Sequence, residues 1–375
     1  MTEQSAVVSG IGMSEVGRRL HIDPWTLTAD AALAAIADAG LTPSDIDGLS
    51  TYPGATWSTP GITGAGVDDV RALLGIKTRW HNGGGEMPGQ LGSIIAAILA
   101  VNAGIVNHVL CFRTVWESTA QDRIGSRSAT MAQVSERESH QWSKAYGVGY
   151  PTYGALWMQR YMHESGATRE QLAQIALTCR AHAALNPQAV YRSPLTMDDY
   201  LSAKMISDPI CLFDCDVPVD GSVAFVISRA DSQPSGSRGI GFAAFGSAGG
   251  MENCAEMMWS RTSLTPADVQ MAELYDGFSI ISILWLEALG LCEPLGAARF
   301  IEGGERIALT GELPFNTGGG QLSGGRLHGY GNMYQACLQL SGGAGERQIR
   351  NKPEVAVVSS GVGTFASSLL LTAGR

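Results

Sequence analysis

The stretch Leu313–Tyr334 combines five glycines between Gly318 and Gly325 with a single histidine, His328. Glycine loses more backbone entropy on folding than any other residue, so such a run does not form an ordinary helix or strand. Its use is to take positive φ, or to let the backbone approach another group closely. A flexible surface loop with a stray histidine has the same composition, but the apolar residues on both sides favour a buried site loop. The sequence therefore predicts one polar ring held at the end of a buried glycine loop.

Other residues that could do chemistry each have a structural explanation as well. Tyr275 could be a core aromatic residue whose hydroxyl contacts a carbonyl group, and Asp276 could cap a helix that begins at Phe278–Ile281. Glu86 stands at a predicted helix start, where the helix dipole favours a carboxylate whether or not it does chemistry. From the residues alone, these alternatives stay open.

Composition narrows the class of protein. The chain has 375 residues, of which 45% are apolar and 16% charged, and its net charge is −10. These values predict a globular protein of two domains or one large duplicated unit, and without a basic cluster they disfavour a nucleic-acid partner. The N-terminus does not have the pattern of a secretory signal, and the longest apolar stretch, Ile94–Val101, is too short to cross a bilayer. Seven scattered cysteines without a C-x-x-C pair indicate a reducing cytoplasm and no zinc site.

An internal repeat organises the chain. Ala6–Gly12 is predicted to be a buried strand that ends in a glycine turn, and Pro24–Ala39 a helix. The segment Leu41–Ser50 then begins with a Leu-Thr-Pro motif that recurs much later in the chain, in Leu264–Leu274. Each copy is expected to form a turn, a short helical start and a strand.

A second pair of matching segments has nearly the same spacing. The glycine cluster Asn82–Glu86 resembles the later segment Asn316–Gln321. A helix and then a strand are predicted after each cluster; the predicted helices are Leu91–Ala103 and Met333–Leu340, and the strands are His108–Phe112 and Val355–Ser359. Two matches in the same order indicate gene duplication with two α/β halves.

We therefore expect an N-terminal half at 1–232 and a C-terminal half at 239–375, with Gln233–Arg238 as the linker between them. The segment 114–205 has no repeat partner and reads as a helical and loop insertion. It could be a lid or substrate wall, or an ordinary helical excursion packed on the core.

Motifs along the whole chain resemble the thiolase superfamily, in its lipid-transfer protein or sterol carrier protein-x branch. The matching segments are His182–Ala189, Ser207–Ala224, Glu273–Ser279, Gly318–Gly331 and Ser359–Gly363. The resemblance implies a layered αβαβα sandwich of duplicated βαβαβ halves. It also implies an obligate dimer in which central strands pair across a two-fold axis, for which we expect His108–Phe112 to be the edge strand.

The chemistry of a thiolase is nevertheless missing. A thiolase carries its acyl group on a cysteine at the start of the helix after the first glycine cluster, and here that region reads Gly83–Pro88, with no cysteine before Cys111. By the same resemblance, Ser359 replaces the second thiolase cysteine and Tyr275 replaces an asparagine, while His328 is kept. A Claisen condensation through an acyl-enzyme is therefore excluded.

Within this branch the chain resembles the side-chain-cleaving steroid aldolases. The resemblance implies retro-aldol cleavage of a β-hydroxyacyl-CoA, here a 17-hydroxy steroid CoA thioester, to a ketosteroid and a short acyl-CoA. Tyr275 would take the hydroxyl proton and His328 would donate to the thioester oxygen. A second tyrosine, expected just before the Leu-His-Gly of the histidine loop, is Arg326 here. Tyr330 could replace it, or Arg326 could hold a neighbouring phenol as phenolate by lowering its pKa.

The expected site follows from these assignments. The catalytic candidates are Tyr275, His328, Tyr330, Arg326 and Asp276, and the substrate-binding candidates are Gly318, Gly319, Gly320, Ser359, Gly361 and Glu86. We expect no cofactor other than the CoA of the substrate. The resemblance further implies a small zinc-ribbon/OB-fold partner and a homodimer at the core of an α2β2 complex. Alternative functions are a catalytically silent acyl-CoA or lipid-binding subunit, and an acyltransferase without a covalent intermediate.

Overall fold

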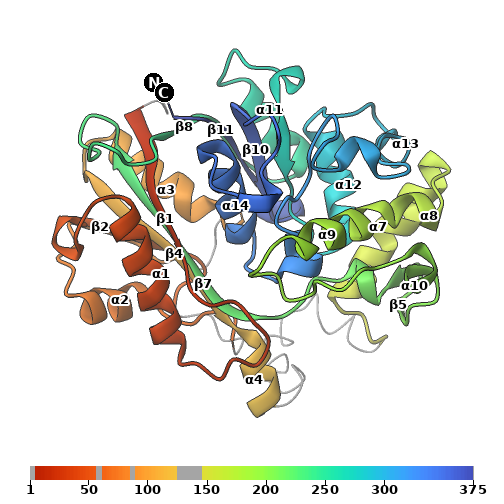
Figure 1. Ribbon diagram of the computed structural model, residues 1–375, viewed down its shortest axis with the longest axis horizontal. Coiled ribbons are helices and arrows are strands. Elements are labelled where there is room, and N and C mark those ends of the chain that lie inside the picture. The colour runs from red at the N-terminus through yellow and green to blue at the C-terminus, as the bar shows by residue number, and fades with distance from the viewer. Residues whose placement is uncertain (1–4, 56–60, 85–88, 125–145, 375) are drawn as a thin grey trace.

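The computed structural model describes residues 5–55, 61–84, 89–124 and 146–374. Its strands form a nine-stranded mixed sheet in the order β3-β2-β4-β7-β1-β8-β11-β10-β9 and a separate two-stranded pair, β5-β6 (Figure 1). The strands of the large sheet are β1 (Ala6–Met13), β2 (Gly48–Thr51), β3 (Trp80–Asn82), β4 (His108–Trp116), β7 (Asp220–Arg229), β8 (Ile240–Ser247), β9 (Met271–Glu273), β10 (Val355–Ser360) and β11 (Ser367–Thr372). The short pair consists of β5 (Met205–Ser207) and β6 (Ile210–Cys211).

The large sheet has two halves with the same strand arrangement, joined where β1 meets β8. In the first half β2 runs parallel to β4, and Leu49 pairs with His81. In the second half β9 runs parallel to β10, and Ala272 pairs with Phe315. Leu49 and Ala272 have the same place relative to the two copies of the Leu-Thr-Pro motif. The duplication predicted from the sequence is therefore confirmed by the strand pairing.

The two copies of the repeated motif also fold alike. Each forms a single 3₁₀ turn, η2 (Pro43–Asp45) and η4 (Pro266–Asp268). In both turns the threonine before the proline donates from its N–H and its hydroxyl to the aspartate three residues later, over 2.7–2.8 Å. The turn closes because these two donors share one carboxylate oxygen, so the local sequence is sufficient to form it.

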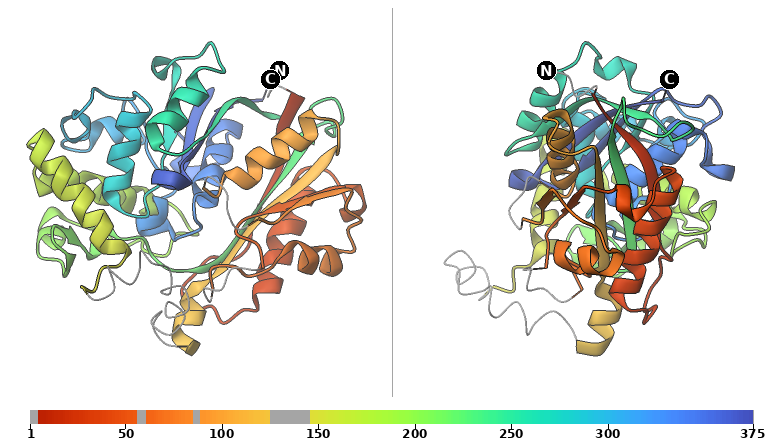
Figure 2. Two further views of the ribbon diagram at one scale, coloured as in Figure 1. Left: turned by 180° about the vertical axis from the view of Figure 1, so that it is seen from behind. Right: turned by 90° about the vertical axis from the view of Figure 1, so that its left-hand side faces the viewer.

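In the described part of the chain, helices cover the outer faces of both halves of the sheet and also lie between the halves. The helices are α1 (Pro24–Asp38), α2 (Val67–Leu74), α3 (Gly92–Asn102), α4 (Glu117–Ile124), α7 (Tyr150–Ser165), α8 (Arg169–Leu172), α9 (Gln174–Ala184), α10 (Met197–Leu201), α11 (Met251–Trp259), α12 (Ser279–Ala288), α13 (Ala297–Phe300) and α14 (Tyr330–Ser341). α1 and α2 cover the first half, α11 and α12 cover the second, and α3 and α14 share the apolar core between the halves (Figure 2). This is the αβαβα layering that the family resemblance implies.

Two sequence-based expectations about the strands are wrong. The glycine turn expected at the end of β1 is absent, because the strand continues to Met13. Gly10 lies inside the strand, where a Cβ would be 2.2 Å from the Ala35 carbonyl oxygen, so the glycine lets α1 cross closely. The segment His108–Phe112 is not an edge strand, since β4 pairs with β2 on one side and with β7 on the other. Its continuous apolar pattern reflects burial on both faces.

The insertion between β4 and β7 packs on the opposite half of the molecule. Its described helices α7, α8 and α9 share an apolar core with α12 and α13 of the second half, and Figure 1 shows them together on one side of the fold. The insertion therefore reaches the glycine loop of the second half, which the sequence alone did not indicate.

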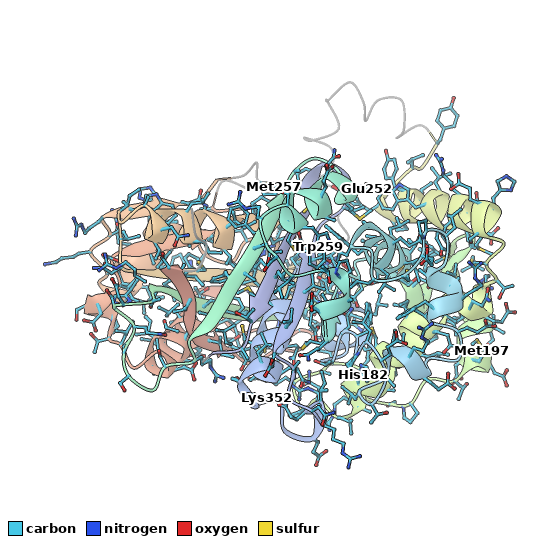
Figure 3. The ribbon with its side chains drawn as sticks, turned by 90° about the horizontal axis from the view of Figure 1, so that it is seen from above. His182, Met197, Glu252, Met257, Trp259 and Lys352 are labelled. Atoms are coloured by element: carbon cyan, nitrogen blue, oxygen red, sulfur yellow. The ribbon has the colours of Figure 1, made fainter. Side chains whose placement is uncertain are left out.

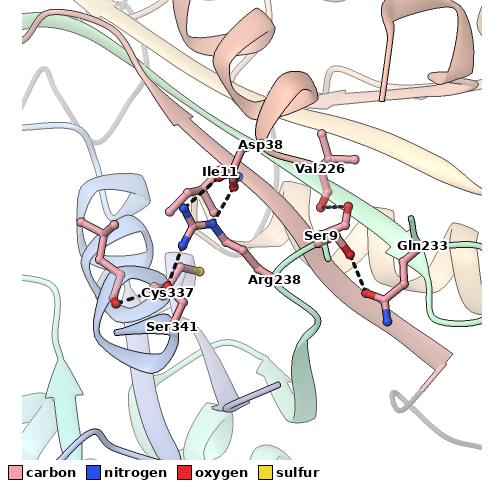
Figure 4. A network of polar contacts seen from close by, with 10 residues as sticks. Ser9, Ile11, Asp38, Val226, Gln233, Arg238, Cys337 and Ser341 are labelled. Atoms are coloured by element: carbon pink, nitrogen blue, oxygen red, sulfur yellow. Dashed lines mark hydrogen bonds and ion pairs between the residues drawn. The ribbon is translucent and has the colours of Figure 1, made fainter. Parts of the chain in front are cut away.

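The predicted linker Gln233–Arg238 is tied to both halves by its last residue. The Arg238 guanidinium pairs with both carboxylate oxygens of Asp38 on α1, at 2.5 and 2.9 Å (Figure 4). Its Nη1 also donates to Ser341 at the end of α14, at 2.6 Å. The bidentate ion pair explains how a polar linker keeps a fixed conformation. The domain bounds 1–232 and 239–375 stay a prediction.

Candidate active site

The glycine-rich loop folds onto the carboxylate of Asp276. In the π-helical turn η6 (Gly320–Gly324), the N–H of Gln321 donates to Asp276 Oδ1 and Oδ2 at 2.9 and 3.0 Å. The N–H of Leu322 also donates to this carboxylate, at 3.4 Å. Gly320 has a φ of 56°, and a Cβ there would lie 1.9 Å from Asp276 Oδ2. The close approach predicted for the glycines is therefore present, and the group approached is the protein's own carboxylate.

The segment His182–Ala189 holds the same loop from the side of α9. His182, which is labelled in Figure 3, has its Nδ1 2.9 Å from the carbonyl oxygen of Phe315. The side-chain amide of Asn186 donates to the carbonyl of Gly318 at 2.9 Å. Burial lowers the pKa of His182, which favours a neutral imidazole. We infer that this histidine is structural.

Tyr275 is held in place by contacts on both sides of its peptide. Its N–H donates to the Ser359 hydroxyl at 3.0 Å. The amide group of Asn316 pairs with both backbone polar groups of Leu274, accepting from N–H at 2.7 Å and donating to C=O at 2.9 Å. The ring lies over Gly277, where a Cβ would be 2.9 Å from Tyr275 Cε1. The phenol position is therefore set by the backbone that carries it.

Burial and, to a smaller extent, the charges around Tyr275 determine its protonation state. Burial, followed by the negative charge of Asp216, raises the pKa of the Tyr275 phenol above its usual range. The amide of Gln321 and the guanidinium of Arg113 oppose this increase but do not cancel it. The resting phenol is therefore protonated at neutral pH.

Glu117, the first residue of α4, connects His328 with Arg326. Its Oε1 lies 3.3 Å from Nε2 of His328, and its Oε2 is paired with Nη2 of Arg326. The other guanidinium nitrogen, Nη1, donates to Asp216 Oδ1 at 2.8 Å. His328 has a φ of 51°, so its ring is presented from a left-handed turn. The histidine is thus fixed by a carboxylate that is itself neutralised by an arginine.

The structure brings Tyr275 and the histidine loop together. A Cβ at Gly329, next to His328, would lie 3.7 Å from Cδ2 of the Tyr275 ring. Asp216 interacts electrostatically with both parts of the site: its charge raises the pKa of Tyr275, and its carboxylate forms an ion pair with Arg326 of the histidine loop. A phenol, an imidazole, two carboxylates and two arginines therefore meet at the carboxyl ends of parallel strands, where α/β folds bind ligands.

Comparisons with known proteins identify relatives that cover almost the whole chain. It is 32% identical to a steroid side-chain-cleaving aldolase of Thermomonospora curvata, over 99% of this chain and 98% of that one. The chain belongs to the thiolase superfamily, in the family of the steroid side-chain-cleaving aldolases. It is also 31% identical to the 17-hydroxy-3-oxo-4-pregnene-20-carboxyl-CoA lyase of Mycobacterium tuberculosis, over 99% of this chain and 100% of that one. Residues 245–375 match the family model described as thiolase C-terminal domain-like.

The fold agrees with this assignment. The solved structure of the Ltp2-ChsH2(DUF35) aldolase superposes with a TM-score of 0.85 and 30% identity, covering 99% of this chain and 98% of that one. The family resemblance and the duplicated thiolase-type fold inferred from the motifs are thereby confirmed.

Arg326 does not stabilise the ionised form of Tyr275. Arg326 is paired with two carboxylates, and burial lowers the pKa of its guanidinium to about 9. The pKa of Tyr275 is raised, not lowered, and Arg113 is the cation that acts on it. The hypothesis that Arg326 keeps this tyrosine ionised is therefore wrong, because neighbouring carboxylates neutralise the arginine.

Tyr330, the other substitute suggested by the sequence, lies in the core between the two halves of the sheet. Its hydroxyl is 2.6 Å from the Ser93 hydroxyl, and its ring centroid is 5.4 Å from that of Phe225. Burial raises the pKa of its phenol well above the usual value. These contacts explain Tyr330 as a core residue with a satisfied hydroxyl.

The other site candidates have internal partners. The carbonyl of Gly318 accepts a hydrogen bond from the Asn186 side chain, and the carbonyl of Gly361 accepts one from Trp285. The carbonyl of Gly319 accepts from the N–H groups of Ser323 and Gly324. The Ser359 hydroxyl accepts from the N–H of Tyr275. Asp276 caps η6 and not α12, whose N-cap is Phe278. Glu86 lies outside the described residues. Their role in substrate binding stays a prediction.

Sequence reasoning missed the charged residues that surround the two catalytic candidates. Arg113 lies inside β4, Glu117 follows that strand directly as the first residue of α4, and Asp216 lies in the loop before β7. The available signal was a single arginine inside an otherwise largely apolar strand, followed by a glutamate directly after that strand.

No described residue offers an activated thiolate or a metal site. Cys179 has its Sγ 3.8 Å from Asp276 Oδ2, and burial raises the pKa of its thiol well above the usual value, so the thiolate is disfavoured. Within the described ranges, no group of three or more His, Cys, Asp or Glu residues could hold a metal ion.

Glu273 on β9 is a buried carboxyl group whose contribution to the free energy of unfolding depends on pH. Its Oε1 accepts from the Thr317 N–H and hydroxyl at 2.8 and 2.6 Å, whereas its Oε2 has no hydrogen-bond partner. Burial, together with the charge of Asp276, raises the pKa of Glu273 to about 8. The folded protein therefore binds a proton that the unfolded chain releases above its ordinary pKa, and the free energy of unfolding falls as pH rises from about 4.5 to 8.

We expect Glu273→Gln to stabilise the protein more at pH 8.5 than at pH 5, because the amide keeps the acceptor for Thr317 and carries no charge. The difference in melting temperature should grow by a few degrees over this range. The matched control is Glu252→Gln on α11, whose side chain is exposed (Figure 3). A gain of equal size at both pH values would show that the charge of Glu273 is not the cause.

Proposed function

We propose that this chain is an aldolase that cleaves a β-hydroxyacyl-CoA by a retro-aldol reaction. Its substrate is a 17-hydroxy steroid with a CoA-thioester side chain, and its products are a ketosteroid and a short acyl-CoA. The observation that supports this most is the pairing of a phenol, Tyr275, with an imidazole, His328, in a thiolase-type site whose sequence lacks the nucleophilic cysteine. The names of the two relatives support this proposal, because one is a steroid side-chain-cleaving aldolase and the other a lyase of a 17-hydroxy steroid carboxyl-CoA.

The reaction needs two functions, and the site has a group for each. A base must take the proton of the β-hydroxyl so that the carbon–carbon bond breaks, and a donor must stabilise the thioester enolate that leaves. We assign the first function to Tyr275 and the second to His328. Glu117 positions the imidazole of His328 through its contact with Nε2. Asp216 is the carboxylate whose charge raises the pKa of the Tyr275 phenol most.

The arrangement around Tyr275 makes proton removal the demanding step. The phenol is protonated at rest, because burial and Asp216 raise its pKa. Arg113 is a buried cation that opposes this increase and so favours the ionised form. The base is therefore formed in a small fraction of molecules at neutral pH, and that fraction grows with pH.

We further propose a partner subunit of the zinc-ribbon/OB-fold type and a homodimer at the core of an α2β2 complex. The solved Ltp2-ChsH2(DUF35) aldolase, which has two named components and the same fold as this chain, supports a partner subunit. In the described part of the chain no helix is long and apolar enough to cross a membrane. A cytoplasmic location is proposed from the seven cysteines, all of which are free thiols.

The proposed function is tested by a cleavage assay with and without a partner subunit of the zinc-ribbon/OB-fold type. We expect a 17-hydroxy steroid CoA thioester to give ketosteroid and acyl-CoA in equal amounts, as measured by mass spectrometry. A protein that binds the thioester and never cleaves it, with the partner present, would instead be an acyl-CoA carrier. Release of free CoA in place of acyl-CoA would indicate thioester hydrolysis and would contradict the aldolase assignment.

A further inference from the structure

The internal repeat extends into the active site. The segment Leu49–Gly54, LSTYPG, matches Ala272–Gly277, AELYDG, in the register set by the two Leu-Thr-Pro motifs. Leu49 and Ala272 occupy equivalent places in the two halves, since each pairs in parallel with the strand segment before a glycine cluster. Tyr52 is therefore the counterpart of Tyr275 in the first half.

The strand pairing places Tyr52 beside a buried arginine. The parallel register of β2 and β4 ends with Thr51 opposite Phe112, whose carbonyl accepts a 2.7 Å hydrogen bond from the Thr51 hydroxyl. The next residues along the two strands are Tyr52 and Arg113. Arg113 comes two residues after Cys111, so its side chain is on the same face of the sheet, toward the core between the two halves.

Arg113 is a cation without a counter-ion among the described residues. Its side chain is 2% exposed, its Nε has no hydrogen-bond partner, and it forms no ion pair with any described carboxylate. Burial lowers the pKa of its guanidinium to about 10, and the phenols of Tyr52, Tyr330 and Tyr275, in that order, oppose this decrease. An unpaired buried charge is costly, and this cost falls when a negative charge forms next to it.

Two of these three phenols are available for chemistry. Tyr330 shares its hydroxyl with Ser93, as described above. Tyr52 is 6% exposed, and its hydroxyl forms no hydrogen bond with another described residue. Burial raises the pKa of the Tyr52 phenol; Arg113 opposes this increase, and the phenol of Tyr150 at the start of α7 adds to it. Arg113 is thus shared by two tyrosines from equivalent positions of the duplicated fold.

We propose that Tyr52 is a second catalytic phenol, which protonates the α-carbon of the enolate, and that Arg113 stabilises whichever of the two phenols is ionised. The assignment rests on the proposed function. In cleavage, Tyr275 takes the proton of the β-hydroxyl and the electrons of the carbon–carbon bond form the enolate. Tyr52 then gives its proton to the α-carbon. One proton moves from oxygen to carbon, nothing is oxidised or reduced, and exchange with solvent restores both phenols.

The roles of the two tyrosines can be distinguished by the reverse of the last step, which is removal of a proton from the α-carbon of an acyl-CoA. Propanoyl-CoA, which has an α-methylene group and no hydroxyl, is incubated in D2O with the protein and its partner, and deuterium uptake is followed by mass spectrometry. We expect Tyr52→Phe to slow this exchange by about 10²-fold or more, while Tyr275→Phe leaves it within about threefold of wild type. Cleavage of the β-hydroxyacyl-CoA should be slow in both variants. Tyr334→Phe, which removes a phenol that acts on Arg238 and not on Arg113, should leave both rates unchanged.

Arg113 is tested by the pH dependence of the same exchange. Arg113→Met should shift the alkaline rise of the exchange rate upward by about one pH unit, and Arg113→Lys should restore much of it, because a cation beside a phenol lowers its pKa. Circular dichroism and binding of propanoyl-CoA identify variants that merely fail to fold. Wild-type exchange in Tyr52→Phe overturns the inference, as does a wild-type protein that cleaves without exchanging. Absence of wild-type cleavage would instead count against the proposed function.

Discussion

Tyr275→Phe is expected to lower turnover by roughly 10²-fold or more while acyl-CoA affinity stays close to that of wild type. The substitution removes only the hydroxyl. The ring still packs over Gly277, and the backbone contact between the Tyr275 N–H and Ser359 is unaffected. The loss should therefore appear in kcat, because the hydroxyl acts on the reacting proton and contributes little to binding. Steady-state kinetics with the partner present measure it.

The pH profile supplies the control for this prediction. Burial and Asp216 raise the pKa of Tyr275, so the ionised fraction at neutral pH is small and increases with each unit of pH. We expect kcat/KM of the wild type to rise about tenfold per pH unit between pH 7 and 9, and Tyr275→Phe to lose this slope. A wild-type plateau near pH 7, or near-full cleavage by the variant, would place the base elsewhere. Tyr52 would then be the first candidate, because the Tyr330 hydroxyl is engaged with Ser93.

Replacement of His328 is expected to slow turnover by about 10²–10³-fold, the usual effect of losing one donor to a developing oxyanion. His328→Ala alone mixes this effect with backbone strain, since the residue has a φ of 51°. Asparagine tolerates a left-handed conformation better than alanine, so His328→Asn is the matched variant that keeps the turn and removes the imidazole.

Both His328 variants should lower kcat with the partner present and leave thermal stability within a few degrees of wild type. Ser359→Ala should have a smaller effect, because its hydroxyl contacts the backbone of Tyr275 and not a reacting atom. If His328→Asn retains turnover within about threefold of wild type, the thioester oxygen is stabilised by another donor and the role assigned to the imidazole is wrong.

Much of this fold was determined locally and could be predicted from the sequence. The repeated Leu-Thr-Pro motif forms the same capped turn twice, since a threonine and an aspartate three residues apart close it without outside help. The glycine loop and the helix after it follow from the backbone freedom of Gly320 and the apolar periodicity of α14. The two glycine clusters could be recognised as equivalent because their sequences are still similar. The same copies implied a duplicated α/β fold, whereas the layered arrangement followed from the family resemblance.

The tertiary structure alone decided which charges meet. Arg113 and Glu117 lie about 100 residues before Asp216 in the chain, and only the tertiary structure brings all three to Tyr275 and His328. The sequence could not show that carboxylates neutralise Arg326, nor that burial raises the pKa of Tyr275 against the effect of a nearby arginine. The position of β4 inside the sheet and the capping of η6 by Asp276 were also hidden. Local propensity is a property of neighbours in the chain, whereas desolvation and ion pairing depend on neighbours in space.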